Sequence, residues 1–377
     1  MPWKEMTNMS QRKEFIVQAK EEGINFSGLC RLFGISRKTG YKWLKREASA
    51  VGLGDQSRRP QHSPRRTEEA IEAQVLEVRK QHQAWGGRKI RKVLQNQGNK
   101  QVPAASTITA ILHRHEKIDP DEAQKHEPWQ RFERDRPNEL WQMDFKGYFA
   151  LSAGGYCHPL TVIDDCSRFL VGLKACPNET SETVKAQLTT IFQQFGLPER
   201  MLMDNGSAWG FDLESRHTTL TAWLIRLGIA ISHGRPYHPQ TQGKDERLNR
   251  TLLEEVIKQR SFSNLQESQT AFDEWWHVYN YIRPHEALQL LTPSTRYIPS
   301  PRPFPAVLAP VTYDPDDMIR KVDIVGKIYF RGRTFRISSA FRHQPVAVRP
   351  TDQDGIFNVF FCTQKVAQIS LRDDNEC

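Results

Sequence analysis

The chain contains no long apolar run, no paired-cysteine motif and no phosphate-binding glycine loop. No stretch approaches the ~18 apolar residues of a membrane-spanning helix, and the first residues include no uninterrupted apolar segment, so we expect neither a membrane span nor a secretory signal. The six cysteines are scattered without a Cys-x-x-Cys pair, which argues against a disulfide framework and a cysteine-based zinc site. The absence of a Gly-x-x-x-x-Gly-Lys-Ser/Thr segment argues against a nucleotide cofactor. Together these features indicate a soluble protein of a reducing compartment.

Positive charge is concentrated in the first third of the sequence. The whole chain has 53 Lys+Arg and 44 Asp+Glu, a formal net charge of +9. Residues 1–118 hold 23 Lys+Arg and 11 Asp+Glu, whereas residues 119–377 hold the remaining 30 and 33. A cationic arm on a near-neutral body indicates nucleic-acid binding. The alternative is a chance imbalance on solvated helices.

Residues 10–46 predict three short helices separated by glycine-containing turns. Asn25 and Ser36 are suitable N-caps for the second and third helices. A helix, a tight turn and a basic amphipathic helix are the plan of a helix-turn-helix domain, here residues 1–50, whose last helix would enter the major groove. The side chains expected to contact DNA are Arg37, Lys38, Tyr41 and Lys42. A three-helix bundle that binds no DNA is the alternative.

A basic linker and a second helical unit follow. Residues 51–66 are rich in Gly, Pro, Ser and Arg, and Arg58 and Arg59 could lie along phosphates. Residues 67–118 predict a second helix-turn-helix-like unit, whose expected DNA contacts are Arg88 and Lys89. Two units in tandem would extend the DNA footprint beyond one major-groove site.

From residue 134 to 300 short apolar strands come first, and strands then alternate with helices, which predicts a mixed α/β domain. Three carboxylates have unusual settings: Asp144 within an apolar strand, Asp204 at the end of another, and Glu246 in the first turn of a helix. A half-buried carboxylate is costly without a partner, and a divalent cation would relieve the repulsion if the three converge. Oxygen ligands suit Mg²⁺ or Mn²⁺, and two such ions can support phosphoryl transfer. Taken singly, an edge-strand residue, a turn former and a helix-dipole partner remain the alternatives.

The sequences around these carboxylates resemble the integrase core of bacterial insertion-sequence transposases and retroviral integrases. The similar stretches are Trp-Gln-Met-Asp at 141–144, Asp-Asn-Gly at 204–206 and His-Pro-Gln-Thr-Gln-Gly-Lys-Asp-Glu-Arg at 238–247. IS481-type transposases, close to the IS3 group, give the best resemblance over nearly the whole chain. It also includes Ser-Arg-Arg-Pro at 57–60, Trp-Gly-Gly-Arg-Lys at 85–89 and Tyr-x-Arg-Pro-His-x-Ala-Leu at 281–288.

This resemblance implies a multidomain protein with tandem helix-turn-helix units and an RNase H-like catalytic core. Its catalytic and metal-binding residues would be Asp144, Asp204 and Glu246. The implied activity is that of a transposase, which cleaves the ends of an insertion sequence and joins them to target DNA with two Mg²⁺ or Mn²⁺ ions. The implied partners are double-stranded DNA and further copies of the chain, with no membrane, and the implied location is the bacterial cytoplasm and nucleoid.

Other acidic residues compete with this set. The 41 residues between Asp204 and Glu246 include Asp212 and Glu214, which we expect to be surface residues. Asp245 directly precedes Glu246, but the family motif has one variable residue between Gly-Lys and the glutamate, which selects Glu246. Two other functions stay open: a non-catalytic DNA-binding regulator with a degenerate integrase-like dimerisation domain, and a metal nuclease that cuts without joining.

Weaker signals lie elsewhere in the body. Lys244, Arg247 and Arg250 could hold phosphates beside the cut or form a solvated helix face. The adjacent carboxylates at 164–165 resemble a structural turn of the family. Residues 311–377 predict short strands, including one over 322–328, and by analogy with integrases a small all-β, SH3-like barrel with one basic side.

Overall fold

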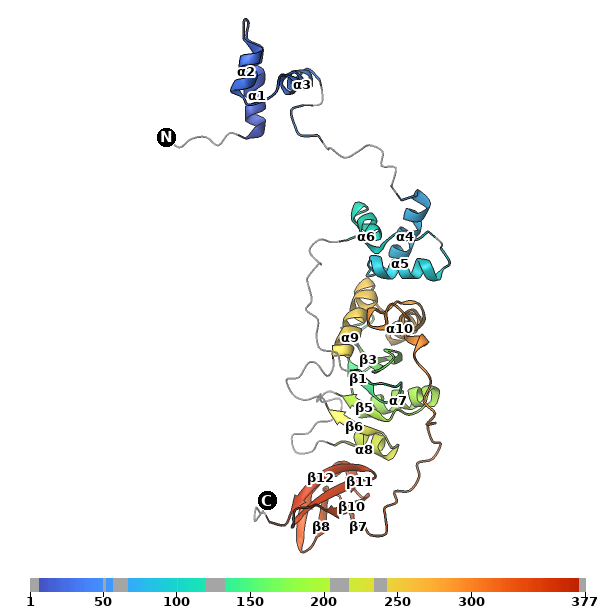
Figure 1. The fold of residues 1–377 in the computed structure, drawn as a ribbon. Helices are drawn as coiled ribbons and strands as arrows, with labels where there is room; N and C mark the ends of the chain where they lie inside the picture. The colour runs from blue at the N-terminus through green and yellow to red at the C-terminus, as the bar shows by residue number, and fades with distance from the viewer. Residues whose placement is uncertain are drawn as a thin grey trace. The chain divides into compact units, whose positions relative to one another are not determined.

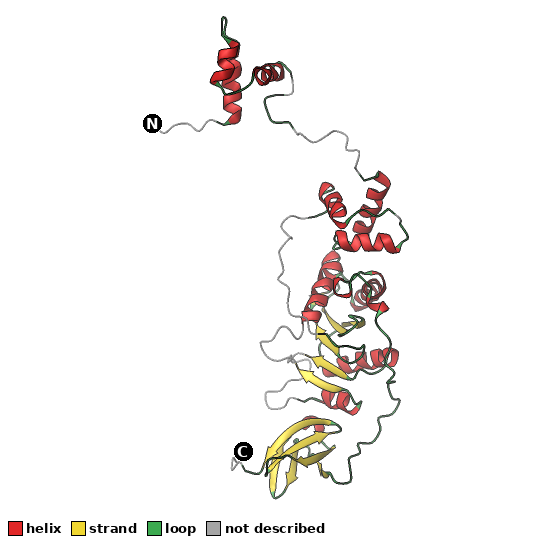
Figure 2. Cartoon of the chain, viewed as in Figure 1, coloured by secondary structure: helices red, strands yellow, loops and turns green. Residues whose placement is uncertain are grey.

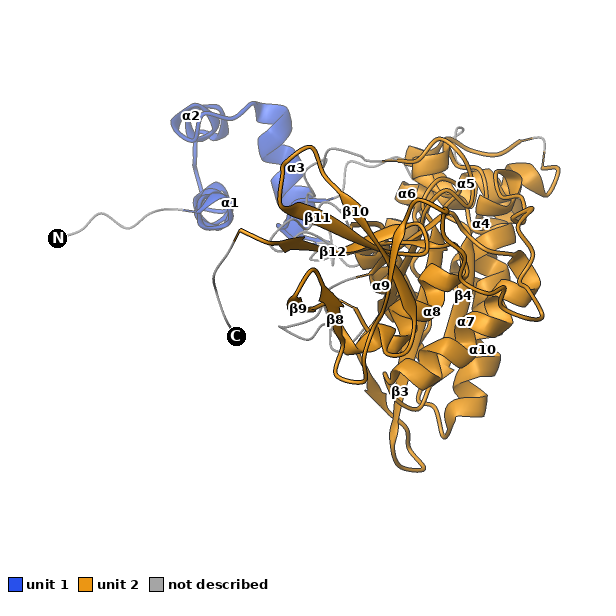
Figure 3. Ribbon diagram, turned by 90° about the horizontal axis from the view of Figure 1, so that it is seen from below, with its two compact units in different colours: residues 1–66 blue, residues 67–377 orange. Residues whose placement is uncertain are grey.

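A computed structural model describes residues 7–49, 52–56, 67–99, 101–118, 133–203, 217–233 and 243–372. Residues 1–66 and 67–377 form two compact units, which are described separately (Figure 3). Within these ranges, no helix has the length and apolar character needed to cross a membrane.

The first unit contains three helices, α1 Asn8–Ala19, α2 Phe26–Leu32 and α3 Arg37–Glu47 (Figure 1). Asn25 accepts a hydrogen bond from the Gly28 amide and Ser36 accepts one from the Thr39 amide, which confirms both predicted N-caps. Gly40 lets α3 approach the small core closely, because a Cβ there would lie 2.9 Å from three side-chain atoms. The segment predicted to be a helix-turn-helix is therefore a packed three-helix domain.

Helices α4 Glu69–Gln81, α5 Gly87–Asn96 and α6 Ala105–Arg114 form a second three-helix group, called here the three-helix unit. Its core surrounds Trp85, which is fully buried just before α5. Gly87 permits the contact between α5 and α6, because a Cβ at this position would lie only 2.4 Å from the backbone oxygen of Ala105.

The α/β core is built on a mixed sheet. Its strands are β1 Trp141–Phe145, β2 Phe149–Ala150, β3 Tyr156–Asp164, β4 Leu170–Cys176, β5 Arg200–Met203 and β6 Ala230–His233. The sheet runs β4-β3-β1-β5-β6, with β2 pairing with one end of β3. The first three are antiparallel, whereas β5 and β6 continue from β1 in parallel. The predicted mixed α/β arrangement is confirmed.

Helices cover both faces of this sheet (Figure 2). α7 Ser181–Phe195 and α8 Thr219–Arg226 share one apolar cluster with sheet residues such as Val162. α9 Gly243–Glu255 and α10 Leu265–His277 share another cluster with residues such as Ile163. Neighbouring residues of β3 thus face opposite layers, as the period of two of a strand requires. The ends of the strands lie between these layers, where the site is formed.

The C-terminal region is all β. β7 Met318–Lys321, β10 Pro345–Pro350, β11 Ile356–Phe361 and β12 Gln364–Ser370 form one antiparallel sheet, and β8 Lys327–Phe330 pairs with β9 Arg333–Arg336. Among the described strands these two sheets do not close, so the predicted SH3-like barrel is not confirmed. The predicted strand over 322–328 is confirmed only at residues 327–328, which begin β8. Asp323 accepts hydrogen bonds from the amides of Val325 and Lys327, and Gly326 has φ +86°, which makes a turn there.

Candidate active site

Asp144 lies near the end of β1, between an apolar strand and helix α9. Its side chain is half-buried. The side-chain amide of Asn249 on α9 donates to Asp144 Oδ2 at 2.7 Å, and the Thr161 hydroxyl on β3 donates to the Asp144 carbonyl at 3.1 Å. The Asn249 bond fixes the carboxylate and holds the middle of α9 beside β1.

The first turn of α9 contains two adjacent acids with different environments. Glu246 is exposed, whereas Asp245 is only 1% exposed and neither of its oxygens accepts a hydrogen bond in the described structure. Burial raises the pKa of Asp245 well above its usual value, and the charges of Asp144 and Asp165 raise it further. Both acids precede Asn249 by about one helical turn, so they share its side of the helix. The first turn of α9 therefore brings a second carboxyl group, that of Asp245, close enough to Asp144 for the charge of one to act on the other.

The third predicted carboxylate, Asp204, lies outside the described residues. β5 is described as far as Met203, which directly precedes it, and β5 runs parallel to β1 with Leu202 opposite Gln142. Within the described ranges, His, Cys, Asp and Glu side chains do not gather in groups of three that could hold a metal ion. The possible metal ligands described near Asp144 are carboxylate oxygens, such as those of Asp245. Oxygen ligands of this kind fit Mg²⁺ or Mn²⁺.

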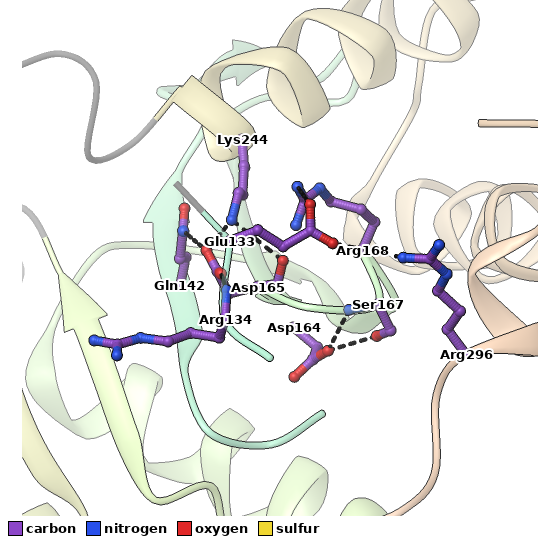
Figure 4. Close-up of polar contacts among 9 residues, drawn as sticks. All are labelled: Glu133, Arg134, Gln142, Asp164, Asp165, Ser167, Arg168, Lys244 and Arg296. Carbon is purple, nitrogen blue, oxygen red and sulfur yellow. Dashed lines mark hydrogen bonds and ion pairs between the residues drawn. The ribbon is translucent and has the colours of Figure 1, made fainter. Parts of the chain in front are cut away.

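Asp165 links α9 to the sheet (Figure 4). The side chain is fully buried, and its Oδ1 accepts from the Gln142 side-chain amide on β1 and from the Lys244 ammonium on α9. Its Oδ2 accepts from the Arg134 backbone amide at 2.8 Å. Lys244 is only 16% exposed, and burial lowers its pKa. This buried ion pair connects the strand of Asp144 with the helix of Glu246.

The neighbouring Asp164 closes the turn after β3. It accepts from the Asn138 amide and from both the amide and hydroxyl of Ser167. Burial raises the pKa of Asp164, and these hydrogen bonds oppose the shift. Arg168 continues the network by pairing with Glu133 at 3.1 Å, as Figure 4 shows. The predicted structural turn therefore has structural partners.

The predicted DNA contacts of the first unit share one exposed face of α3. Its exposed side chains are Arg37, Lys38, Tyr41, Lys42 and Lys45. They follow the i, i+1, i+4, i+5, i+8 spacing of a single helix face, opposite the buried Trp43. This surface can meet a phosphate backbone. Arg58 and Arg59 lie outside the described residues.

The other predicted DNA contacts have varied surroundings. Arg88 is exposed and lies 3.7 Å from Glu286, whereas Lys89 is half-buried and burial lowers its pKa to about 8. Arg247 and Arg250 are exposed on α9. Lys244 is instead held by Asp165, so its charge supports the site from inside.

Three residues of this site do not follow from the sequence patterns: Asn249, Asp165 and the buried Asp245. Asn249 lies three residues after Glu246, and this spacing on a helix is a signal that could have indicated its place in the site. The other two depend on contacts that only the folded sheet creates.

Family models match most regions of the chain. Integrase core domain models match residues 134–239 and 227–293, and a model of the IS481 family transposase C-terminal domain matches residues 317–377. A helix-turn-helix domain model matches residues 11–61 and a homeodomain-like one matches residues 39–112.

Similar proteins come from insertion elements and retroviruses. An uncharacterized 31.7 kDa protein of insertion element IS407 from Burkholderia multivorans is 27% identical over 158 residues, which are 42% of this chain and 54% of that protein. A 39.2 kDa protein of IS476 from Xanthomonas euvesicatoria is 23% identical, over 66% of this chain and 71% of that protein. The Gag-Pol polyprotein of avian reticuloendotheliosis virus is 29% identical over 33% of this chain, but only 10% of the polyprotein is covered.

Among solved structures, a simian T-cell lymphotropic virus intasome in complex with a PP2A regulatory subunit matches with a TM-score of 0.39 and 16% identity. That match covers 78% of this chain and 95% of the other. The HTLV-2 integrase catalytic core domain in complex with magnesium matches with a TM-score of 0.33 and 20% identity, over 43% of this chain and 97% of the other.

An integrase core, which is RNase H-like, joined to helix-turn-helix domains defines a protein of the transposase and integrase class. The match to the IS481-family C-terminal domain and the insertion-element relatives support a transposase of the IS3/IS481 type.

Proposed function

We propose that this protein binds the ends of an insertion sequence, cleaves them and joins them to target DNA. The observation that carries the proposal is the Asn249–Asp144 hydrogen bond, which links α9, about one turn after Glu246, to the end of β1. The parallel pairing of β1 with β5, whose last described residue directly precedes Asp204, supports a role for all three carboxylates. Asp144, Asp204 and Glu246 are accordingly the proposed catalytic residues.

The same three carboxylates would hold two Mg²⁺ or Mn²⁺ ions. Support for a cation comes from the buried Asp245, neither of whose oxygens accepts a hydrogen bond in the described structure and whose pKa is raised by burial and by the charges of Asp144 and Asp165. Bound divalent ions would activate the attacking oxygen and stabilise the leaving one. Asn249 holds Asp144 in place, and the Lys244–Asp165 pair holds the helix of Glu246 against the sheet.

The reaction would proceed in two transfers at phosphorus. Water attacks the phosphodiester at the element end, the P–O3′ bond breaks, and the 3′ oxygen leaves as a hydroxyl after taking up a proton. That 3′-OH then attacks a target phosphodiester, which forms the new P–O bond and releases the target's own 3′-OH. Each step exchanges one P–O bond for another, so no covalent protein intermediate is needed.

DNA recognition would come from α3 of the first domain, with further phosphate contacts in the linker, the three-helix unit and α9. We propose domain limits of 1–50, 67–118, 134–300 and 311–377, with a basic linker at 51–66. The last domain would be SH3-like, with a basic side suited to phosphates. Since both ends of the element must meet, an oligomer would form on DNA, in the cytoplasm and on the nucleoid.

A strand-transfer assay with labelled element ends tests the proposal. We expect the wild type to cleave and join in Mg²⁺, and Asp144→Asn, Asp204→Asn and Glu246→Gln to lose both steps while still binding the ends. Glu254→Gln, an exposed position on the same helix, is the matched control. Joining by the three site variants would refute the assigned catalytic set.

Two other results would favour the rival functions. Wild-type protein that binds ends but neither cleaves nor joins them would indicate a regulator. Cleavage in Mg²⁺ without any joined product would indicate a nuclease.

A further inference from the structure

Glu255, at the last residue of α9, is a buried acid with three donors from three parts of the chain. Its side chain is 9% exposed. Oε1 accepts from the Trp85 indole at 3.2 Å and from Arg283 Nε at 3.1 Å, and Oε2 accepts from the Trp275 indole at 2.9 Å. Trp85 belongs to the three-helix unit, whereas the other two donors belong to the core. One carboxylate therefore joins the three-helix unit to the catalytic domain.

The contact between Trp85 and Glu255, called here the junction, has further apolar and charged contacts around it. Val278, which follows α10, packs against the core cluster of the three-helix unit. The His82 ring stacks on Trp85 with their centroids 3.7 Å apart. The charges of Arg283 and Glu255 both act on Lys89, whose pKa burial lowers to about 8. Lys89 thus lies close to the junction.

Two sequence motifs meet here. Gly87 lets α5 pack on the Ala105 backbone, which fixes the turn that carries Trp85. In the Tyr-x-Arg-Pro-His segment, Arg283 donates to Glu255, and the His285 ring packs on Tyr279 at 4.6 Å. The Trp-Gly-Gly motif of the three-helix unit and the Tyr-x-Arg-Pro-His motif of the core therefore both contact Glu255.

Helix α9 connects this junction with the candidate site. Glu255 lies nine positions after Glu246, about 14 Å along a helix at 1.5 Å per residue. The helix is held near its start by Lys244 on Asp165, in its middle by Asn249 on Asp144 and at its end by Glu255. A change at either end moves the same rigid element.

We propose that the three-helix unit docks on the core through Trp85 and Glu255, and that this docking positions α9 for catalysis. Glu255 is a positioning residue, and the Trp-Gly-Gly turn is a docking element. The part that concerns catalysis rests on the proposed role of Glu246. The docking itself does not depend on that role.

Trp85→Phe in the full chain tests the docking, because it removes the indole donor and keeps a ring. Hydrogen exchange should become at least about tenfold faster in α5 and α9, the effect expected for loss of one hydrogen bond to a charged group. Glu255→Gln, whose single carbonyl oxygen cannot serve three donors, should give a similar change. Glu254→Gln, the exposed neighbour paired with Lys258, is the matched control and should leave exchange unchanged.

Strand transfer supplies the second readout. With saturating element ends, both junction variants should need several-fold more Mg²⁺ for half-maximal joining, with end-binding affinity unchanged. A purely structural role would lower the fraction of folded protein without shifting the Mg²⁺ requirement. Exchange and Mg²⁺ requirement equal to those of Glu254→Gln would overturn the proposal. Retained joining by Glu246→Gln would refute the proposed function alone, since the exchange result stands without it.

Discussion

The buried ion pair between Asp165 and Lys244 gives the sharpest stability prediction. Asp165→Asn would leave the Lys244 ammonium, 16% exposed, without its carboxylate partner. Breaking a buried pair by removing one charge typically costs about 3–5 kcal/mol. The Asn amide would also face the Arg134 N–H, which now donates to Oδ2, so one further hydrogen bond is lost. We therefore expect at least about 3 kcal/mol of destabilisation.

Urea unfolding of the full chain, with the core transition followed by near-ultraviolet circular dichroism, measures this loss. Lys244→Met removes the other charge, and the double variant should be at least about 1 kcal/mol more stable than the sum of the single effects predicts. Glu254→Gln breaks the exposed Glu254–Lys258 pair and should cost no more than about 0.5 kcal/mol. The reasoning is refuted if Asp165→Asn costs no more than this control.

Three other predictions concern packing, pH and salt. Gly87→Ala should lower the free energy of unfolding in urea by about 1–3 kcal/mol, because the new Cβ would lie 2.4 Å from the Ala105 oxygen. Gly86→Ala, with no atom within 4 Å of the new Cβ, is the control and should be nearly neutral. Equal effects of the two substitutions would contradict the packing argument. Burial lowers the pKa of His285 to about 3, below its ordinary 6.5, so the unfolded chain binds more protons between these values. The free energy of unfolding should therefore fall as pH drops below about 6.5, by up to about 1.4 kcal/mol per pH unit, and an unchanged slope in His285→Asn would exclude this cause. Lys42→Ala should weaken binding to DNA of any sequence and lower the slope of log affinity against log salt concentration by about one, the value of one phosphate contact. Fluorescence anisotropy at several salt concentrations measures this slope, and an unaltered slope would show that Lys42 does not contact DNA.

Local features of the fold follow well from the sequence. The caps at Asn25 and Ser36 depend on residues within one turn, and the structure confirms them. The apolar strand predicted around Asp144 is likewise confirmed as β1. The strand expected at 322–328 forms only from 327, because a glycine at positive φ and an aspartate that binds nearby amides favour a turn before it.

The contacts that organise the site are long-range, so no local pattern predicts them. The sequence predicts Lys244 to be a phosphate contact on a helix face, but its ammonium donates to Asp165, 79 residues earlier in the chain. Trp85 and Glu255 are 170 residues apart. The burial of Asp245 and exposure of Glu246 depend on the rotation of α9 against the sheet, which its sequence alone does not set.

Metal preference in strand transfer tests the central claim, that these carboxylates hold the catalytic cations, most directly. In Asp144→Cys a softer sulfur ligand replaces a hard oxygen, which disfavours Mg²⁺ more than Mn²⁺. The account predicts that this variant loses joining in Mg²⁺ and regains it in Mn²⁺, while Glu254→Cys joins equally in both. Full joining by Asp144→Cys in Mg²⁺ would contradict the claim that Asp144 binds the metal.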